Sequence, residues 1–574
     1  MKKNLFSALA LGAVLSLASC NNLDLDPLDS LDQELFFGSD QDAILAINGV
    51  YAALVESESV VVAWCVGLGS DEAQNGESNG DGSGAELSAM QFNPGTAQHI
   101  YWVWGDHYYG IANATALIDK LNDPATPVSD AIRKRVRGEA EFLRAYYYHA
   151  PVQIFGDVPL VIQSGYNAGV GVERDDVHKV YAQIVKDLED AATDLAEYPD
   201  NDAYGLSDKG RVTQGSAYGQ LAKVYLVWAQ TEGATDVDGK YAKAIEYADK
   251  VVGYSLEAKF HSNWEKDNRY GKETLFAANY VLSQESFGDG GNHLTHCAFS
   301  SGFSQQTPHV VLSDRTYYDR FDNRDQRKEA TFLSHAINPE TNQDFVFDMP
   351  RYAKNIDLDE PLTSSKSREL QAPILRYAEV LLTKAEAEIE RSGGNLSNAR
   401  DAINEVRRRA YRVDIYADPA NPNGLTIADA DIPATATQAE LRKALRRERL
   451  YELTYEQNRW FDLVRWKVLV KTVKRVAKHN ADGYTTASNY ASAQQNVAKK
   501  SNVSSKNYRF PIPQSQRNLN SKLTQNWGYE GSTAATPPYA DASYEGGADN
   551  NDGWTDAEID VLYNNISLVV THSH

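Results

Sequence analysis

The stretch between Pro433 and Gly483 contains no glycine or proline, and it constrains the fold more than any other part of the chain. Such a stretch predicts helix, although it is too long for one ordinary globular helix. We therefore expect a break near Gln457-Asn458 and a second helix from Arg459 onward. Apolar residues recur at the three- and four-residue steps of a core-facing helix. They are Leu441, Ala444, Leu445, Leu453, Trp460, Phe461, Leu463 and Val464.

Charged residues lie among these apolar positions. Arg449 and Glu452 are three residues apart, as are Glu456 and Arg459, and Arg459 and Asp462, so each pair can meet on one helix face. A carboxylate buried among core residues has to be paired. A solvated, salt-bridged face is one interpretation. We favour a partly buried cluster of structural ion pairs over that face and over a catalytic acid and base.

The N-terminus has the layout of an export signal. Lys2 and Lys3 precede an apolar run from Leu5 to Leu17, which is too short to span a bilayer. The run leads into Ala18-Ser19-Cys20, which looks like a bacterial lipobox. We expect residues 1–19 to be a lipoprotein signal peptide and Cys20 to be acylated, because several acyl chains anchor a protein stably. Residues 20–40 would form an acidic tether. An ordinary signal peptide that happens to carry a cysteine is the alternative.

Composition excludes several classes of function. The formal net charge of −23 argues against nucleic acid or anionic lipid as the main partner. Beyond Cys20, only Cys65 and Cys297 remain. Export would permit them to form a disulfide, but two separate thiols are the simpler expectation. The chain has no CxxC or HExxH spacing, no GxSxG and no phosphate-binding glycine loop. We expect no metal, no cofactor and no catalytic centre.

Helical patterns dominate the body of the chain, and short connections between them predict antiparallel helix pairs. Repeated hairpins of this length indicate a mainly α, tetratricopeptide-like superhelical scaffold. Residues 254–372 differ, since they mix short apolar runs with Gly, Asn and Ser, and we expect a loop-rich region carrying short strands. The predicted helices cover residues 42–54, 97–121, 129–155, 175–197, 213–230, 240–253, 373–392 and 396–410.

The C-terminal residues 530–574 are acidic and contain no Lys or Arg. This composition predicts a disordered extension. An extra strand or a lid that contacts a partner is the alternative. The segment around Gly553 does not fit a calcium loop, because Ala548 stands where the first ligand would be needed.

Six blocks, in order, resemble the SusD/RagB family of outer-membrane nutrient-binding lipoproteins of Bacteroidetes. The resemblance runs from Cys20 to about Tyr529, with Gln457 in place of a usual Gly and Trp527 in place of a common Pro. The blocks are Arg137–Tyr146 with Phe155–Leu160, Arg211–Thr213 with Leu221–Leu226, Pro373–Leu382 with Ala385–Ala387, Ile403–Arg407, Arg459–Trp466, and Phe510–Pro513 with Thr524–Tyr529.

The resemblance implies that residues 41–529 form a helical nutrient-binding domain. It implies a non-enzymatic protein, lipid-anchored at the cell surface on the outer membrane, that binds an oligosaccharide or polysaccharide and closes as a lid over a SusC-like TonB-dependent transporter. Some members of the family bind peptides instead. Two other interpretations remain open, namely a surface glycan hydrolase that uses two carboxylates and a helical-repeat scaffold for a protein partner.

Ligand contacts in such a protein are expected on turn-rich loops, where aromatic faces and polar side chains are accessible. The first candidate loop is 71–84, together with Trp64. The second is 284–306, whose two histidines lack a third ligand for a metal. Trp102 and Trp104 precede a helix and are expected to pack in the core. The candidate contacts are Trp64, Asp71, Asn75, Asn79, Phe287, His293, His296, Phe299 and Phe303.

Overall fold

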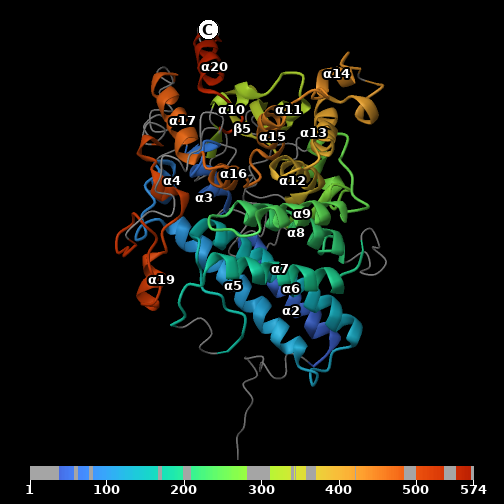
Figure 1. The fold of residues 1–574 in the computed structure, drawn as a ribbon, viewed down its shortest axis with the longest axis vertical. Helices are drawn as coiled ribbons and strands as arrows, with labels where there is room; N and C mark the ends of the chain where they lie inside the picture. Colours follow the sequence, from blue (N-terminus) through green and yellow to red (C-terminus); the bar gives the residue numbers. More distant parts are fainter. Residues whose placement is uncertain are drawn as a thin grey trace, which may run out of the picture.

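The computed structural model is mainly helical, as Figure 1 shows, which confirms the predicted fold class. It describes residues 38–56, 62–75, 82–165, 171–197, 208–280, 311–313, 315–337, 342, 344–356, 370–420, 422–483, 500–534 and 551–569. Within them, no helix combines the length and the apolar character that a membrane span requires. The expected signal peptide and Cys20 lie outside the described residues.

Stacked helices form one half of the molecule (Figure 1). Consecutive members from α5 to α9 pack against each other, α2 packs on α5 and α6, and α9 contacts α12, which in turn packs on α13 and α15. This order gives the expected antiparallel hairpins. The helices are α2 (Asp40–Glu56), α5 (Gln98–Asn122), α6 (Asp130–Phe155), α7 (Val177–Asp194), α8 (Gln214–Gln230), α9 (Val237–Asp249), α12 (Tyr377–Glu390), α13 (Leu396–Tyr411) and α15 (Gln438–Leu453).

Local sequence signals set where these helices begin and how closely they pack. Thr213 and Thr437 each form a capping box with the residue three positions later, which satisfies otherwise unpaired backbone N–H groups. Gly110 on α5 faces the ring of Tyr147 on α6, and a Cβ there would lie 2.6 Å from ring carbons. The glycine therefore permits the close approach of α5 and α6.

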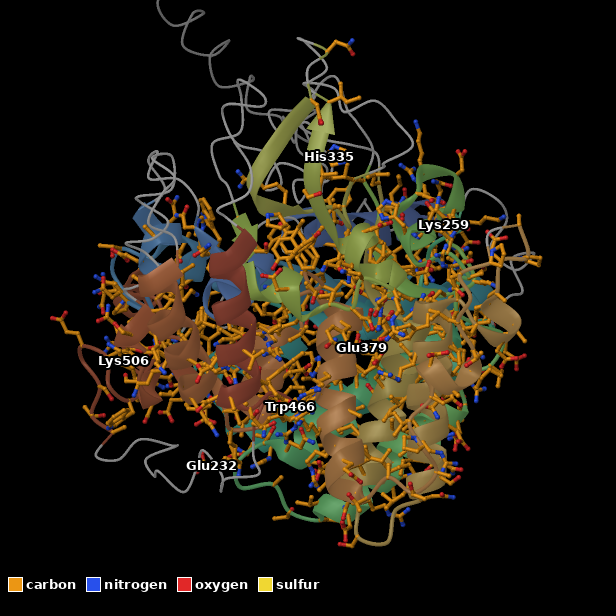
Figure 2. All side chains as sticks on the ribbon, turned by 90° about the horizontal axis from the view of Figure 1, so that it is seen from above. Glu232, Lys259, His335, Glu379, Trp466 and Lys506 are labelled. Carbon is orange, nitrogen blue, oxygen red and sulfur yellow. The ribbon has the colours of Figure 1, made fainter. Side chains whose placement is uncertain are left out.

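Within the described residues, three two-stranded antiparallel sheets form, and most of their strands come from the loop-rich region. They pair β1 (Ala73–Asn75) with β3 (Val311–Ser313), β2 (Thr274–Ala278) with β6 (Ala372–Arg376), and β4 (Phe332–Ile337) with β5 (Asp344–Tyr352). The helix predicted over 373–392 is wrong at its start, because residues 373–376 pair as a strand with β2 before α12 begins. In Figure 2, His335 marks the β4–β5 hairpin, which projects away from the helical body that holds Glu379 and Trp466.

The stretch after Pro433 breaks at residues 454–458, which include the predicted Gln457-Asn458, and the second helix begins at Arg459 as expected. Helix α15 ends at Leu453, and α16 (Arg459–Arg465) and α17 (Leu469–Gly483) follow. Tyr455 and Gln457 have φ values of 61° and 62° in the intervening turn. A left-handed conformation favours glycine, which explains why a glycine would suit position 457. Here Gln457 adopts it at a cost of about 1 kcal/mol.

Two further expectations are corrected. The predicted loop 71–84 contains strand β1 and the start of α4 (Gly82–Ser88). The predicted disorder of 530–574 is wrong for 551–569, which include α20 (Asp556–Val569), because this segment packs on α10 and α17. The remaining helices are α3 (Val62–Leu68), α10 (Arg315–Arg320), α11 (Gln326–Thr331), α14 (Ile427–Ala430) and α19 (Gln514–Leu519), with 3-10 turns at Phe260–Trp264, Lys266–Asn268, Asp414–Tyr416, Lys500–Asn502 and Ser505–Tyr508.

Candidate functional site

A buried group of arginines and aspartates joins α16 to distant parts of the chain. The guanidinium of Arg459 donates to Asp71 from Nε at 2.7 Å and from Nη2 at 2.9 Å, and to Asp552 at 2.7 Å. Arg320 lies 3.3 Å from Asp71, and Arg475 donates to Asp552 at 2.8 Å. Burial alone would raise the pKa of Asp71, but Arg459 and Arg320 hold it below its ordinary value. Both aspartates are therefore held ionised.

A second cluster surrounds Glu452 at the end of α15. Its carboxylate lies 3.0 Å from Arg327, 2.9 Å from Arg376 and 2.5 Å from Arg409. Burial would raise the pKa of Glu452, yet the surrounding guanidinium groups hold it far below its ordinary range. Glu456 is the next acid along the chain, and it pairs with Arg376 at 2.8 Å and with Lys354 at 2.6 Å.

A third cluster joins α15, α16 and α12. Arg449 donates two hydrogen bonds to Asp462, at 2.8 and 2.9 Å, and Arg465 lies 2.7 Å from the same carboxylate. Arg465 also pairs with Glu386, which accepts a hydrogen bond from the Trp466 indole at 2.8 Å. Burial would raise the pKa of Glu386, but the two arginines lower it to about 2. These carboxylates are structural counter-ions.

The pairings expected between residues three apart are wrong. Arg449 pairs with Asp462, whereas Arg459 pairs with Asp71 and Asp552. The reason is the turn after Leu453, which changes the direction of the chain so that α15 and α16 present their charges to other elements. Such pairing across elements depends on tertiary contacts that a helical repeat does not encode.

Among the described acids next to these three clusters, Glu72 is the one whose pKa is raised to near 7. Burial raises the pKa of Glu72 to about 7, although its carboxylate accepts a hydrogen bond from the backbone N–H of Tyr455 at 2.6 Å. A raised pKa suits a general acid. However, the adjoining cavity is about 10 Å³, which is room for about one water molecule. Glu72 therefore has no space for a substrate beside it.

The structure moves two candidate ligand contacts into the core. Asp71 is 1% exposed and is occupied by arginines, and Asn75 is 5% exposed on β1. Both expectations fail because the 71–75 segment packs beneath α3 and α4 instead of forming a solvent loop. Trp64 lies on α3 and Cys65 is buried. The side chain of Trp64 lies outside the described residues, as do Asn79, Phe287, His293, His296, Cys297, Phe299 and Phe303.

A solvent-facing aromatic surface lies on α5. Among the aromatic side chains that the structure describes, Tyr101 and Tyr109 are the most exposed, at 42% and 62%. Gly105 lies midway between them, where an added Cβ would meet nothing within 4 Å. Trp102 is half-buried beside this surface, and Trp104 is buried as expected. We call Tyr101, Trp102, Gly105 and Tyr109 the α5 aromatic face.

Sequence reasoning did not single out Tyr101 and Tyr109, although a signal was present. Tyr101, Gly105 and Tyr109 are spaced four residues apart, which places them along one broad side of a helix. The buried side of the same helix carries Ile100, Val103, Trp104, His107 and Ile111. Assigning the helix register would have separated the two sides.

A second aromatic array on α7, α8 and α9 is unsuited to stacking a ligand. Tyr225 stacks on Tyr247 with ring centroids 5.7 Å apart and an interplanar angle of 10°. Trp228 stacks on Tyr181 at 5.8 Å and 16°. Lys240 and Lys250 also lie over the Trp228 and Tyr247 rings, 4.5 and 4.6 Å from the ring centroids. The faces on which a sugar ring would pack are therefore already covered.

An open cleft of about 730 Å³ lies between the α8–α9 turn and helices α15 and α16. Its lining is polar and carries both signs of charge, including Glu232, Glu390, Arg442 and Arg465. Arg442 is bound to Glu390 at 2.6 Å. Trp466 also lines the cleft but is only 3% exposed, so it offers no open face. The cleft can accept hydroxyl-bearing groups mainly through hydrogen bonds to its charged side chains.

Comparison with known proteins finds SusD-like relatives that match most of the chain. Residues 247–529 match the family described as "SusD family", and residues 42–226 match "Starch-binding associating with outer membrane". The chain is 27% identical over 492 residues to SusD-like protein P2 of Formosa agariphila, covering 79% of this chain and 89% of that protein. It is 30% identical over 288 residues to the starch-binding protein SusD of Bacteroides thetaiotaomicron, covering 46% and 48%.

Solved structures share the fold. A SusD homologue from Bacteroides thetaiotaomicron superposes with a TM-score of 0.73 at 24% identity, covering 86% of this chain and 98% of that one. A laminarin-binding SusD-like protein superposes with a TM-score of 0.64 at 22% identity, covering 86% and 100%.

Proposed function

The chain belongs to the SusD/RagB family, and on this premise we propose that it binds an oligomeric glycan at the cell surface. In this proposal it passes the glycan to a SusC-like TonB-dependent transporter and closes over that barrel as a lid. The observation that supports glycan binding is the match of residues 42–226 to a starch-binding family associated with the outer membrane. Relatives that bind starch and laminarin point the same way.

We assign the α5 aromatic face as a contact surface for the glycan. Tyr101 and Tyr109 are eight residues apart, which is about 12 Å along a helix axis. That spacing allows two rings to pack on separate sugar units of one chain. Gly105 leaves the backbone between them open, so a glycan can lie close to the helix. Tyrosine combines a large apolar face with a hydroxyl that can bond to a sugar hydroxyl.

The proposal includes no chemical step. The buried carboxylates of the three clusters are paired with arginines, and the pKa of Glu386 is about 2. A glycosidase needs one carboxyl group that holds its proton near neutral pH beside an accessible sugar. Binding of a peptide in the same uptake role is the second candidate, and a surface glycan hydrolase is the third.

The membrane anchor is part of the same proposal. Acylation at Cys20 would hold the protein on the outer membrane through a lipid, with residues 20–40 as the tether between anchor and domain. The anchor and tether would keep the glycan-binding domain next to the transporter, where a captured oligomer need not diffuse away.

The test is a glycan array probed with a soluble form that begins after Cys20, followed by calorimetry and product analysis for each hit. We expect saturable binding of at least one oligosaccharide, with the ligand recovered intact. Shortened products would favour the hydrolase. Affinity for the barrel transporter without affinity for any glycan would favour a scaffold, and binding of peptides alone would favour the second candidate.

A further inference from the structure

The C-terminal residues 551–558 lie against a strongly basic surface formed by α10, α15, α16 and α17. The carboxylate of Asp552 is fully buried, bound to Arg459 at 2.7 Å and Arg475 at 2.8 Å, and lies 3.8 Å from Arg320. Burial would raise the pKa of Asp552, but these arginines hold it far below its ordinary range. The segment thus delivers one carboxylate into a pocket of three guanidinium groups.

The backbone of the same segment is also recognised. Arg446 donates to the carbonyl of Asn551, Arg447 Nε donates to the carbonyl of Gly553 at 2.7 Å, and Arg475 donates to the carbonyl of Trp554 at 3.1 Å. Three arginine-to-carbonyl contacts within four residues, around a buried acid, are the kind of contact made to an extended peptide. They require no helix or strand in the bound segment.

Trp554 and Glu558 extend the contact along α15. The Trp554 ring is 8% exposed, and the guanidinium of Arg447 lies 4.2 Å from its centroid. Glu558 pairs with Arg447 at 2.6 Å and with Lys443 at 3.1 Å. A buried aromatic ring flanked by charge pairs is the usual form of an interface anchor.

Gly553 restricts which sequences the basic surface can bind at this position. Its φ is +100°, and a Cβ there would lie 3.0 Å from the backbone nitrogen of Arg447. A side chain at this position would therefore meet both backbone strain and a steric clash. The surface accepts Asp-Gly-Trp and disfavours the same segment with any larger residue at its centre.

Charge balance indicates that this surface needs an occupant. Without residues 551–558, the buried guanidinium groups of Arg320 and Arg459 would share Asp71 as a carboxylate partner, and Arg475 would lose both Asp552 and Asp556. Buried charge without a counter-ion is costly, so a second carboxylate is strongly favoured. Asp71 immediately precedes Glu72 and strand β1, and an occupant of the site therefore also stabilises the segment that leads into residues 76–81.

We propose that α10, α15, α16 and α17 form a peptide-recognition site for an Asp-Gly-Trp segment, that the chain's own residues 551–558 occupy it, and that it binds this segment in trans once the covalent connection is cut. The occupant is a segment of the same chain, reached through residues 535–550. The site is separate from the α5 aromatic face and does not rest on the proposed glycan function.

The test uses the full soluble chain carrying a protease site within residues 535–550, cleaved after folding. We expect the released C-terminal fragment, which contains residues 551–574, to stay bound through gel filtration and to exchange with a labelled peptide of residues 551–569. Fluorescence anisotropy should show saturable binding. The D552N peptide should bind at least tenfold more weakly, and the G553A peptide should also lose affinity, whereas D556N should bind like the parent. Asp556 is the matched control because its side chain is 67% exposed and lies 3.8 Å from Arg475, and so exposed an ion pair contributes little to affinity.

All substitutions lie in the peptide, so the parent and variant peptides are compared on the same folded receptor. Equal affinity for the parent and D552N peptides would overturn the proposal, as would release of the fragment without any binding of added peptide. The uncleaved chain should bind the peptide at least tenfold more weakly, because its site is filled. If the uncleaved chain elutes as a dimer that the peptide dissociates, the segment is supplied by a second copy of the chain. That result would overturn occupancy of the site by the chain's own segment.

Discussion

Arg459 and Asp71 are 388 residues apart in sequence and form a buried, two-pronged ion pair, with Nε and Nη2 of the arginine 2.7 and 2.9 Å from the two carboxylate oxygens. The pair fixes α16 to the segment just before strand β1. It shows why the Arg459–Trp466 stretch matters to the fold: its charges join elements from the beginning, middle and end of the chain.

Replacing Arg459 with alanine should lower the free energy of unfolding by about 3–5 kcal/mol, because Asp71 and Asp552 would each lose a buried partner. Chemical denaturation measures the change. Arg324→Ala is the control, since Arg324 pairs with Asp322 while its side chain is 53% exposed, and it should shift stability little. An Arg459 variant as stable as the parent would contradict the structural role. Glycan affinity of the folded fraction should be unchanged.

Replacing Glu141 with glutamine should stabilise the protein at alkaline pH. Burial, and then Asp187 and Asp190, raise the pKa of Glu141 from 4.5 to about 8. Below about pH 4.5 both folded and unfolded states hold the proton, so this group gives no pH dependence there. As the pH rises towards 8 the unfolded state releases its proton while the folded state retains it, so stability falls.

Glutamine removes this linkage, and the Glu141→Gln variant should gain about 2–4 kcal/mol over the parent at pH 8. The gain should vanish near pH 4.5. Melting curves between pH 4.5 and 8.5 measure it, with the exposed Glu173→Gln as the matched control. A difference between parent and variant that stays constant across this range would show that Glu141 titrates normally.

Removing the two exposed rings of the α5 aromatic face should weaken glycan binding. The Tyr101→Ala, Tyr109→Ala double variant should lose affinity for an array-identified oligosaccharide by about tenfold, or about 1.4 kcal/mol. Its melting temperature should move little because both rings are exposed. The corresponding double phenylalanine variant keeps the faces and is the control. Unchanged glycan affinity combined with lost binding to the transporter would assign this face to the barrel interface.

The second candidate loop, residues 284–306, provides a separate test of glycan binding. Replacing Phe287, Phe299 and Phe303 together with alanine should reduce affinity for the same oligosaccharide by about tenfold or more if these rings also stack on the glycan. Calorimetry and a melting curve on one preparation measure both quantities. A large fall in melting temperature would instead show that the three rings belong to the core.

Replacing Cys20 with alanine should leave a folded protein without its anchor, because acylation is separate from the packing of the domain. Membrane fractionation of cells that lack the transporter measures the effect. The variant should appear in the soluble fraction with the melting temperature of the mature domain. Tight membrane association that persists in those cells would show a second means of attachment.

The sequence by itself determined the fold class and most helix positions, because helix periodicity and capping are local properties of the chain. The expected helices over 97–121 and 213–230 match α5 (98–122) and α8 (214–230) within one residue at each end. The same local signals mistook residues 373–376 for helix, since pairing with β2 is a contact between distant segments.

Only the tertiary structure decided which charges meet and which rings face solvent. The acids and arginines of 449–462 were recognisable as a set, but the turn at 454–458 directs them to partners in other parts of the chain. These partners come from α11, α12, α13, β6, the segment before β1 and the segment before α20. Contacts with distant arginines also explain why Asp71 is a core residue and why the 551–558 segment packs on the helical body. A buried carboxylate takes whichever guanidinium the fold brings within about 3 Å, and that proximity follows from the packing of distant elements.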